Sequence, residues 1–232
     1  MKTKSLSLTT LLLIAIHFIS CAQDDSNTNY VTNDSITKDG YTLIYINKAE
    51  NFSASVEQKL KDTFFAVYPI LAKQYNENTT KTVTFVIDPA YEGVAATSAD
   101  RVVYNPEWFA KHPGDIDVVT HEVMHIVQGY GYQSGPWWVT EGIADYVRYK
   151  FGVDNAGAGW SLPNVSETQN YDNSYRITAR FFAWIVKTKD DQFIEKMDQI
   201  MRDHTYTDQT WVELTGKTSA DLWTEYIANP AI

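Results

Sequence analysis

The pattern of hydrophobic and polar positions divides the chain into a first part with strands and a second part made of helices. Residues 41–46 alternate apolar and polar side chains as a half-buried strand does, and residues 81–87 predict a second strand. Residues 94–104 predict a third strand, interrupted at residues 98–100. Residues 56–75 repeat apolar side chains with the period of a long helix. The first part therefore predicts a small sheet accompanied by one long helix.

Helices are predicted for most of the rest of the chain. A short helix begins at Pro106, and apolar residues then recur with helical spacing from residue 118 to residue 127, with Asp115 as the predicted N-cap. The later predicted helices cover residues 137–151, 173–187, 190–202, 207–214 and 219–227. We expect an α+β fold in which a small, mostly antiparallel sheet packs on the helix at 118–127, with a mainly helical C-terminal half.

The N-terminal residues carry the pattern of an export signal. Two lysines precede an apolar run, residues 11–19, which is too short to span a bilayer as a helix. Cys21 follows it and is the only cysteine in the chain, so it has no disulfide partner there. Its position resembles the lipobox cysteine of bacterial lipoproteins. We predict a signal peptide at residues 1–20, a lipidated Cys21 with a flexible tether at residues 21–40, and one domain at residues 41–232, on the periplasmic or outer side of a membrane; free secretion is the alternative.

The charge balance limits the partners of the exported domain. The chain carries a formal net charge of −10, and removal of the signal peptide would delete two lysines and no acid. Such a surface argues against nucleic acid and against adsorption to anionic lipid. We therefore expect contact with a membrane only through the lipid anchor. The oligomeric state does not follow from the sequence.

The sequence His121-Glu122-Val123-Met124-His125 predicts a metal site. Two histidines four positions apart on a helix project from one face and can bind the same ion. Glu122 projects from the next position around the helix, where its carboxylate can take a proton from water. Hydrolytic zinc sites need three protein ligands and one open position, and Glu141 is the best candidate for the third ligand.

A second acid on the helix of Glu141 completes the predicted site. Asp145 lies four positions further along, on the same face, where it can accept the other ring N–H of a ligating histidine. We therefore expect one Zn²⁺ per chain, held by His121, His125 and Glu141. The alternative is a core helix with two satisfied histidines. That arrangement would bury several charged groups without a compensating cation.

The stretches HEVMHIVQ and WWVTEGIADYVR closely resemble the basic secretory protein family of plants and bacteria. Residues 175–181 resemble the family's Tyr-x-x-Thr-Ala-Arg-Phe stretch, and the similarity spans roughly residues 41–226. The resemblance implies a zincin-like fold and a zinc metallopeptidase of the gluzincin type that acts on peptides or proteins. Plant members are basic and this chain is acidic, so nothing is inferred about their partners.

The expected mechanism assigns Glu122 as the general base that later passes its proton to the leaving amine. The oxyanion needs a further donor, and Tyr175 is the first choice because it matches the family stretch. Tyr171, Arg176 and His204 are the alternatives. Residues 94–104 are the expected substrate-binding edge, or else an ordinary hairpin.

Other assignments are less consistent with the sequence. Gly129-x-Gly131 lacks the third glycine of a dinucleotide loop, and Gln128 stands where a metzincin has glycine. The aromatic residues near Glu141 predict either a substrate cleft or ordinary core: Tyr130, Tyr132, Trp137 and Trp138. Two other functions stay open, a non-catalytic surface-binding lipoprotein on the same scaffold and a zinc amidase that acts on cell-wall amide bonds.

Overall fold

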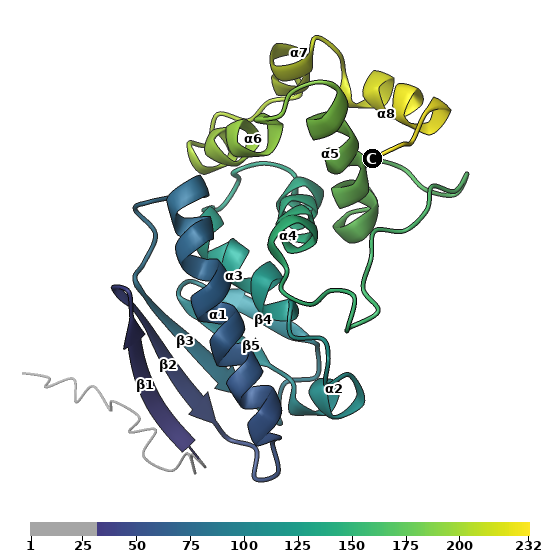
Figure 1. The fold of residues 1–232 in the computed structure, drawn as a ribbon. Coiled ribbons are helices and arrows are strands. Elements are labelled where there is room, and N and C mark those ends of the chain that lie inside the picture. The colour runs from purple at the N-terminus through teal and green to yellow at the C-terminus, as the bar shows by residue number, and fades with distance from the viewer. Residues whose placement is uncertain (1–31) are drawn as a thin grey trace, which may run out of the picture.

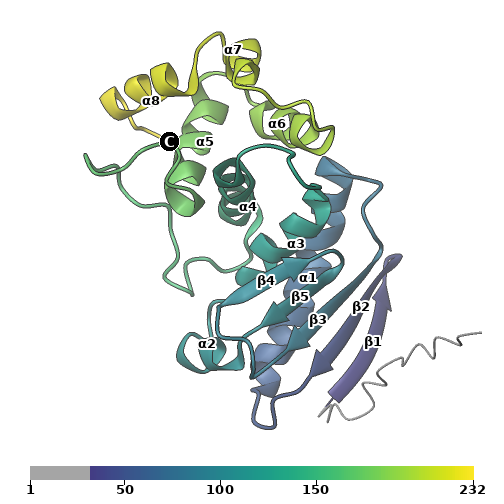
Figure 2. The same cartoon turned by 180° about the vertical axis from the view of Figure 1, so that it is seen from behind.

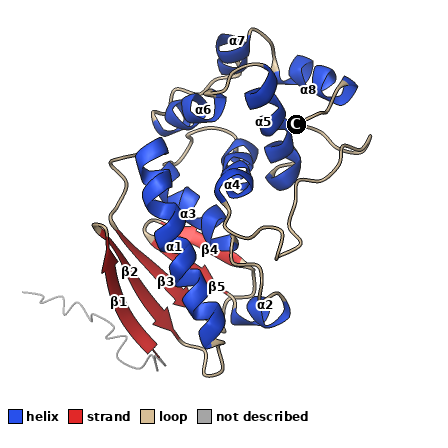
Figure 3. Ribbon diagram, viewed as in Figure 1, coloured by secondary structure: helices blue, strands red, loops and turns tan. Residues whose placement is uncertain are grey.

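The computed structural model describes residues 32–232, so the predicted signal peptide and Cys21 lie outside the described residues. Figure 3 shows strands in the first half of this part and helices in the second. The strands are β1 Thr32–Lys38, β2 Tyr41–Asn47, β3 Thr82–Ile87, β4 Ala95–Ser98 and β5 Arg101–Tyr104. The helices are α1 Ala54–Tyr75, α2 Pro106–Lys111, α3 Val118–Gln128, α4 Trp137–Phe151, α5 Tyr175–Thr188, α6 Phe193–Arg202, α7 Gln209–Thr215 and α8 Ser219–Ala228.

The strands form one five-stranded sheet in the order β1-β2-β3-β5-β4. Its outer pairs, β1 with β2 and β4 with β5, are antiparallel, whereas β2, β3 and β5 run parallel. The prediction of a mostly antiparallel sheet was therefore wrong at the centre. The reason is the connections: α1 carries the chain back between β2 and β3, and a helical crossover returns the next strand in the same direction.

Strand β1 also corrects the predicted domain boundary. It lies within residues 21–40, which were predicted as a tether, so residues 32–38 are part of the folded sheet. The strand pairs with β2 through a turn at Asp39-Gly40, whose φ values are 52° and 83°. Both values suit a two-residue hairpin turn. The prediction missed this strand because β1 is at an edge and largely exposed, and an edge strand needs few apolar side chains.

The helices α1 and α3 lie against the same face of the sheet. Figure 1 shows both in front of the strands, and Figure 2 shows the sheet in front of them. Helix α1 contacts β2, α3 contacts β4, and α4 packs between α3 and α5. Helices α5 to α8 gather beyond α4, away from the sheet, whereas α2 lies near the end of the sheet (Figure 1). This arrangement puts α3 at the boundary between the sheet and the helical half.

The helical predictions agree closely with the structure. Helix α4 spans the predicted residues 137–151, and each predicted helix of the C-terminal half has a counterpart within a few residues. The interrupted strand at 94–104 is the hairpin β4–β5, with β4 at the sheet edge. Within residues 32–232, every helix is too short or too polar to cross a membrane.

Candidate metal centre

Helix α3 presents the two motif histidines from a buried position. Its apolar face is in the core, with Val119, Val123 and Val127 fully buried. The helix ends at Gly129, whose φ of 55° lies in the left-handed region and whose N–H bonds to the carbonyl of His125. The core contacts and the C-terminal cap at Gly129 together hold α3 in place.

The predicted N-cap of α3 requires a correction. Asp117, not Asp115, occupies the cap position, and its side chain accepts the backbone N–H groups of residues 153 and 154. Asp115 instead forms an ion pair with Arg148 and accepts a hydrogen bond from the indole of Trp108. The chain makes another turn between Asp115 and the helix, which places this carboxylate beside α4.

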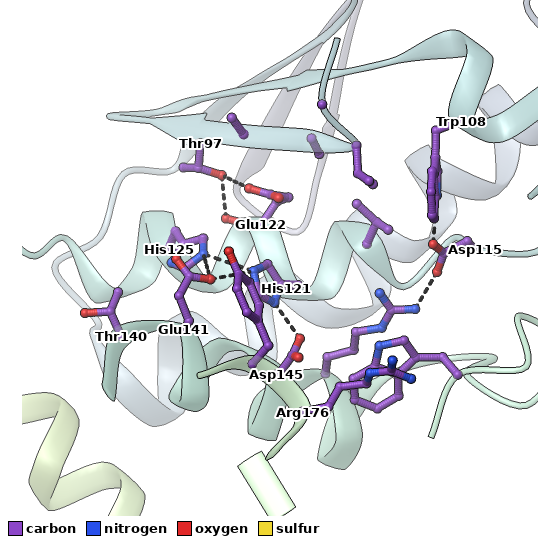
Figure 4. A pocket seen from close by; sticks show the side chains of 18 of the residues that line it. Thr97, Trp108, Asp115, His121, Glu122, His125, Thr140, Glu141, Asp145 and Arg176 are labelled. Atoms are coloured by element: carbon purple, nitrogen blue, oxygen red, sulfur yellow. Dashed lines mark hydrogen bonds and ion pairs between the residues drawn. The ribbon is translucent and has the colours of Figure 1, made fainter. Parts of the chain in front are cut away.

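The structure brings His121, His125 and Glu141 together. The Nε2 atoms of the two rings are 3.1 Å apart, and Oε2 of Glu141 lies 3.2 Å from Nε2 of His121 and 3.5 Å from Nε2 of His125. One ligating atom of each residue lies within 4.8 Å of the others. Figure 4 shows the three side chains converging from α3 and α4. Each is only partly buried, so the cluster is reachable from outside.

Partners on the far side of each ring determine its orientation. Nδ1 of His121 lies 2.7 Å from a carboxylate oxygen of Asp145, and Nδ1 of His125 lies 2.7 Å from the amide oxygen of Gln128. Gln128 is held in turn because its amide nitrogen donates to the carbonyl of Thr140, at 3.0 Å. Both oxygens can only accept, so each Nδ1 carries a proton and each Nε2 faces the centre of the cluster, where it would bind an ion once its ring is neutral.

The electrostatics of the cluster favour positive charge at its centre. Burial opposes the charged form of His121, but the Asp145 and Glu141 carboxylates outweigh it and raise the pKa of this ring to about 10. Burial likewise raises the pKa of Glu141, but hydrogen bonds from the two histidines outweigh it and lower that pKa to about 2. The Glu141 carboxylate therefore stays ionised beside the two rings.

The donor set fits a zinc ion. Two neutral rings would point lone pairs at each other across 3.1 Å, so this arrangement needs a positive charge between them, which a proton on His121 or a bound cation can supply. Two imidazole nitrogens and one carboxylate oxygen are ligands that zinc accepts in hydrolytic sites. His121, His125 and Glu141 would hold the ion, and Asp145 and Gln128 would keep the rings aimed at it.

Glu122 points away from this trio toward the sheet edge. The residue is 7% exposed, and its carboxylate lies 2.7 Å from the hydroxyl of Thr97 in β4. The same hydroxyl is 2.9 Å from the main-chain oxygen of Glu122 (Figure 4). Glu122 shares one cavity with His121 and Glu141, so its carboxylate borders the place where a substrate would lie.

Tyr175 lies beside the cluster. Its ring stacks on His121 with centroids 6.1 Å apart, and it meets Trp137 edge to face. Burial, followed by the charges of Glu141 and Asp145, raises the pKa of its hydroxyl, so the group stays a donor at neutral pH. The φ of 48° puts this residue in the left-handed region, which is unusual for a bulky side chain. Such strain is found at functional sites.

The three alternatives to Tyr175 are placed differently. Arg176 lines the same cavity, whereas Tyr171 packs against Trp138 and Trp223, and His204 lies near Ser134. Tyr175 and Arg176 are therefore the two of the four that border the cavity.

Of the aromatic residues around Glu141, some border the cavity and others do not. Tyr130 lines the cavity, whereas Trp138 stacks on Trp211 in the core. Trp137 and Tyr132 are strongly exposed, at 62% and 89%. The predicted aromatic cleft is thus reduced to Tyr130, with Tyr175 added from α5.

A cavity of about 1270 Å³ joins the metal cluster to Glu122, Tyr130, Tyr175 and Arg176. One wall is the strand β4 with the residues just before it, and the opposite wall comes from α4 and the start of α5. Figure 4 shows Thr97 and Glu122 on one side of the metal cluster and Asp145 on the other. Because β4 is the edge strand, its free side faces a space that a peptide could enter.

Two functional side chains were not predicted as such. Gln128 orients His125, and Thr97 contacts Glu122. Gln128 had a detectable signal, because it lies three positions after His125 and so on the same helix face. Thr97 had none, since its contact depends on where the sheet edge meets α3.

Comparison with known proteins identifies a family for this chain. A sequence profile of the BSP family, described as peptidase of plants and bacteria, matches residues 32–226. No curated protein sequence matches the chain.

Solved structures share the fold at low sequence identity. A two-domain M1 zinc metallopeptidase crystallised with L-tryptophan superimposes with a TM-score of 0.54 at 13% identity, covering 88% of this chain and 52% of that one. The M1 zinc metallopeptidase of Deinococcus radiodurans with a Tyr-Ser-Ala substrate gives 0.53 at 14% identity, with 88% and 53% covered. This chain thus spans about half the length of those proteins.

The profile match includes the metal cluster, the edge strand and most of the helical half, and the fold is that of M1 zinc metallopeptidases. The chain therefore belongs to the BSP family, the peptidases of plants and bacteria.

Proposed function

We propose that this protein is an exported zinc peptidase of the HExxH and glutamate type, with one zinc ion held by His121, His125 and Glu141. One observation carries the proposal: three ligating atoms lie within 4.8 Å of one another, in a cavity that also contains Glu122 and an unpaired strand edge. Membership of a peptidase family and the zinc metallopeptidase fold support the same reaction.

The chain's own residues divide the work of peptide-bond hydrolysis. A zinc ion bound to this set supplies a Lewis acid that acidifies water and polarises a carbonyl group. Glu122 accepts the proton of the attacking water and returns it to the amine that leaves. The Tyr175 hydroxyl donates a hydrogen bond to the oxyanion that forms on the scissile carbonyl and keeps its proton. Asp145 and Gln128 keep the two rings oriented throughout.

The substrate is proposed to be a peptide in extended form. It would add to the sheet beside β4, as zincin-like peptidases use an edge strand packed on the motif helix. Main-chain pairing would hold the scissile bond over α3, between Glu122 and the metal ligands. An acidic domain with such a groove needs no nucleic acid or membrane surface for this activity.

Export and anchoring stay proposals from the sequence. Residues 1–20 would direct export, and Cys21 would be acylated at the new N-terminus. Substitution of Cys21 by serine should release the protein from the membrane fraction of a bacterial host. Unchanged fractionation would contradict lipidation.

Metal content tests the central proposal. Residues 22–232, purified without chelator or histidine tag, should carry about one zinc per chain by plasma emission. His121→Ala should lose it, and His204→Asn should keep it, since His204 lies outside the cluster and asparagine tolerates its φ of 58°. A peptide library should then be cleaved by the zinc-loaded protein alone. A zinc-replete protein without bound zinc would contradict the site, and a zinc-loaded protein that cleaves nothing would contradict the activity.

A further inference from the structure

Glu122 has a contact that the metal cluster does not explain. Its carboxylate Oε2 lies 2.7 Å from the hydroxyl of Thr97, and its own carbonyl oxygen lies 2.9 Å from the same hydroxyl. Among residues 32–232, Thr97 is the one side chain that forms a hydrogen bond with this carboxylate, and Glu122 as a residue is only 7% exposed. A buried carboxylate with a single donor takes its orientation from that donor.

The position of Thr97 in β4 gives this contact a second significance. Asn105 donates its N–H to the carbonyl of Val94, at 3.0 Å, just before the strand. In an antiparallel pair of strands, every second residue directs its main-chain N–H and C=O groups toward the partner strand. Val94 does so, and therefore Ala95 and Thr97 direct these groups away from β5. The Ala95 carbonyl already accepts a bond from the Tyr91 hydroxyl. Thr97 thus offers its main chain to the free edge while its side chain bonds to Glu122.

The Thr97 hydroxyl can form a hydrogen bond with Glu122 both before and after Glu122 takes a proton from water. It has one proton and two lone pairs. While Glu122 is ionised, the hydroxyl donates to Oε2. After Glu122 takes a proton from water, its O–H can donate to Thr97 Oγ1, and Thr97 turns its own proton to the Glu122 carbonyl. Thr97 has no net gain or loss of protons in this exchange, and the distances of 2.7 Å and 2.9 Å suit the two bonds.

We propose that Thr97 is a positioning residue whose hydroxyl holds the Glu122 carboxylate in place beside the metal cluster. The inference rests on the proposed role of Glu122 as general base. Every substitution at position 97 keeps the main chain that would pair with substrate. Removal of the hydroxyl is therefore expected to lower kcat and to leave KM nearly unchanged.

Two substitutions separate the hydroxyl from the shape of the side chain. In the zinc-loaded protein, Thr97→Val should lower kcat at least tenfold with KM within twofold, while Thr97→Ser should stay within threefold of wild type. Thr84→Val, a matched change in β3, should alter neither constant. The proposal is overturned if Thr97→Val keeps the wild-type kcat, if Thr97→Ser loses as much, or if only KM changes.

A double-variant experiment tests whether Thr97 acts through Glu122. In a Glu122→Gln background, Thr97→Val should cause no further loss of the residual rate, and an additional tenfold loss would refute the coupling. A wild-type protein that cleaves no peptide would overturn the proposed function itself. In that case the contact between Thr97 and Glu122 can still be tested in the metal-free protein. The shifts in Tm caused by Thr97→Val and Glu122→Ala should be non-additive in the double variant, and additive shifts would overturn the proposed contact.

Discussion

The cavity has two ends that both bury carboxylates, and they balance the charge differently. At one end Asp115 is paired with Arg148, whose guanidinium also bonds to Asn155 and lies over the ring of Trp160. The Trp108 indole donates to the second oxygen of Asp115, at 2.8 Å. Figure 4 shows Trp108 and Asp115 at the opposite side of the site from Glu141. This end compensates its own charge within the chain.

The other end lacks such a partner among the described residues. Glu141 and Asp145 face the rings of His121 and His125, and no lysine or arginine of residues 32–232 lies within ion-pair distance of these carboxylates. The pKa of His121 is raised because of the same excess of carboxylate charge around its ring. One end is thus built for stability and the other to receive a cation. The following predictions test this division, from the largest expected effect to the smallest.

Glu141→Ala should remove zinc from the receiving end and with it all activity. Two histidines alone leave the ion with too few protein ligands for a stable hydrolytic site. Metal content after dialysis measures the effect, with Glu107→Gln, an exposed glutamate of α2, as control. Full zinc occupancy in Glu141→Ala would show that the third ligand is another residue.

Glu122→Gln should keep zinc and lower the peptidase rate about a thousandfold, because the amide cannot accept a proton from water. The rate constants and the zinc content are measured on the same preparation. A variant that cleaves peptide at the wild-type rate would eliminate Glu122 as the general base.

Arg148→Met should cost about 3 kcal/mol of unfolding free energy, because it leaves the buried Asp115 carboxylate without its cation. Urea unfolding measures the loss, and zinc stoichiometry should stay unchanged. The double variant Arg148→Met with Asp115→Leu should recover part of the stability. If Arg148→Met instead emptied the metal site with its stability intact, the two ends would not be independent.

Tyr175→Phe should lower kcat about a hundredfold with KM and zinc content unchanged, since it removes one oxyanion donor. Tyr132→Phe, at a tyrosine that is 89% exposed, is the matched control. Should Tyr175→Phe leave kcat unaltered, Arg176 becomes the next residue to test, because it lines the same cavity.

Asp145→Asn should weaken zinc binding about tenfold to a hundredfold, because it orients His121 without touching the ion. Competition with a chromogenic chelator measures the affinity. The two variants together test whether Glu141, and not Asp145, is the metal ligand. If Asp145→Asn empties the site while Glu141→Ala does not, ligand and orienting partner have been exchanged.

The local patterns explain which parts of the fold were predictable. Helix α4 and the pair His121 and His125 follow from periodicity, because a helix repeats every 3.6 residues regardless of its neighbours. The direction of β3 beside β2 was not predictable in the same way, since it depends on the path of α1 between them. The hairpin partner β1 was missed because an exposed edge strand has a weak hydrophobic pattern.

In the candidate site, too, some contacts could be predicted from the sequence and others could not. The residues that approach one another on α3 and α4, together with the family, were determined by the sequence, because spacing on a helix sets which side chains share a face. Only the tertiary structure decided that Thr97 bonds to Glu122, that Asp115 pairs with Arg148, and that Tyr175 rather than Tyr171 borders the cavity. Each of these contacts joins elements far apart in the chain, and the packing of a sheet edge against helices sets such distances.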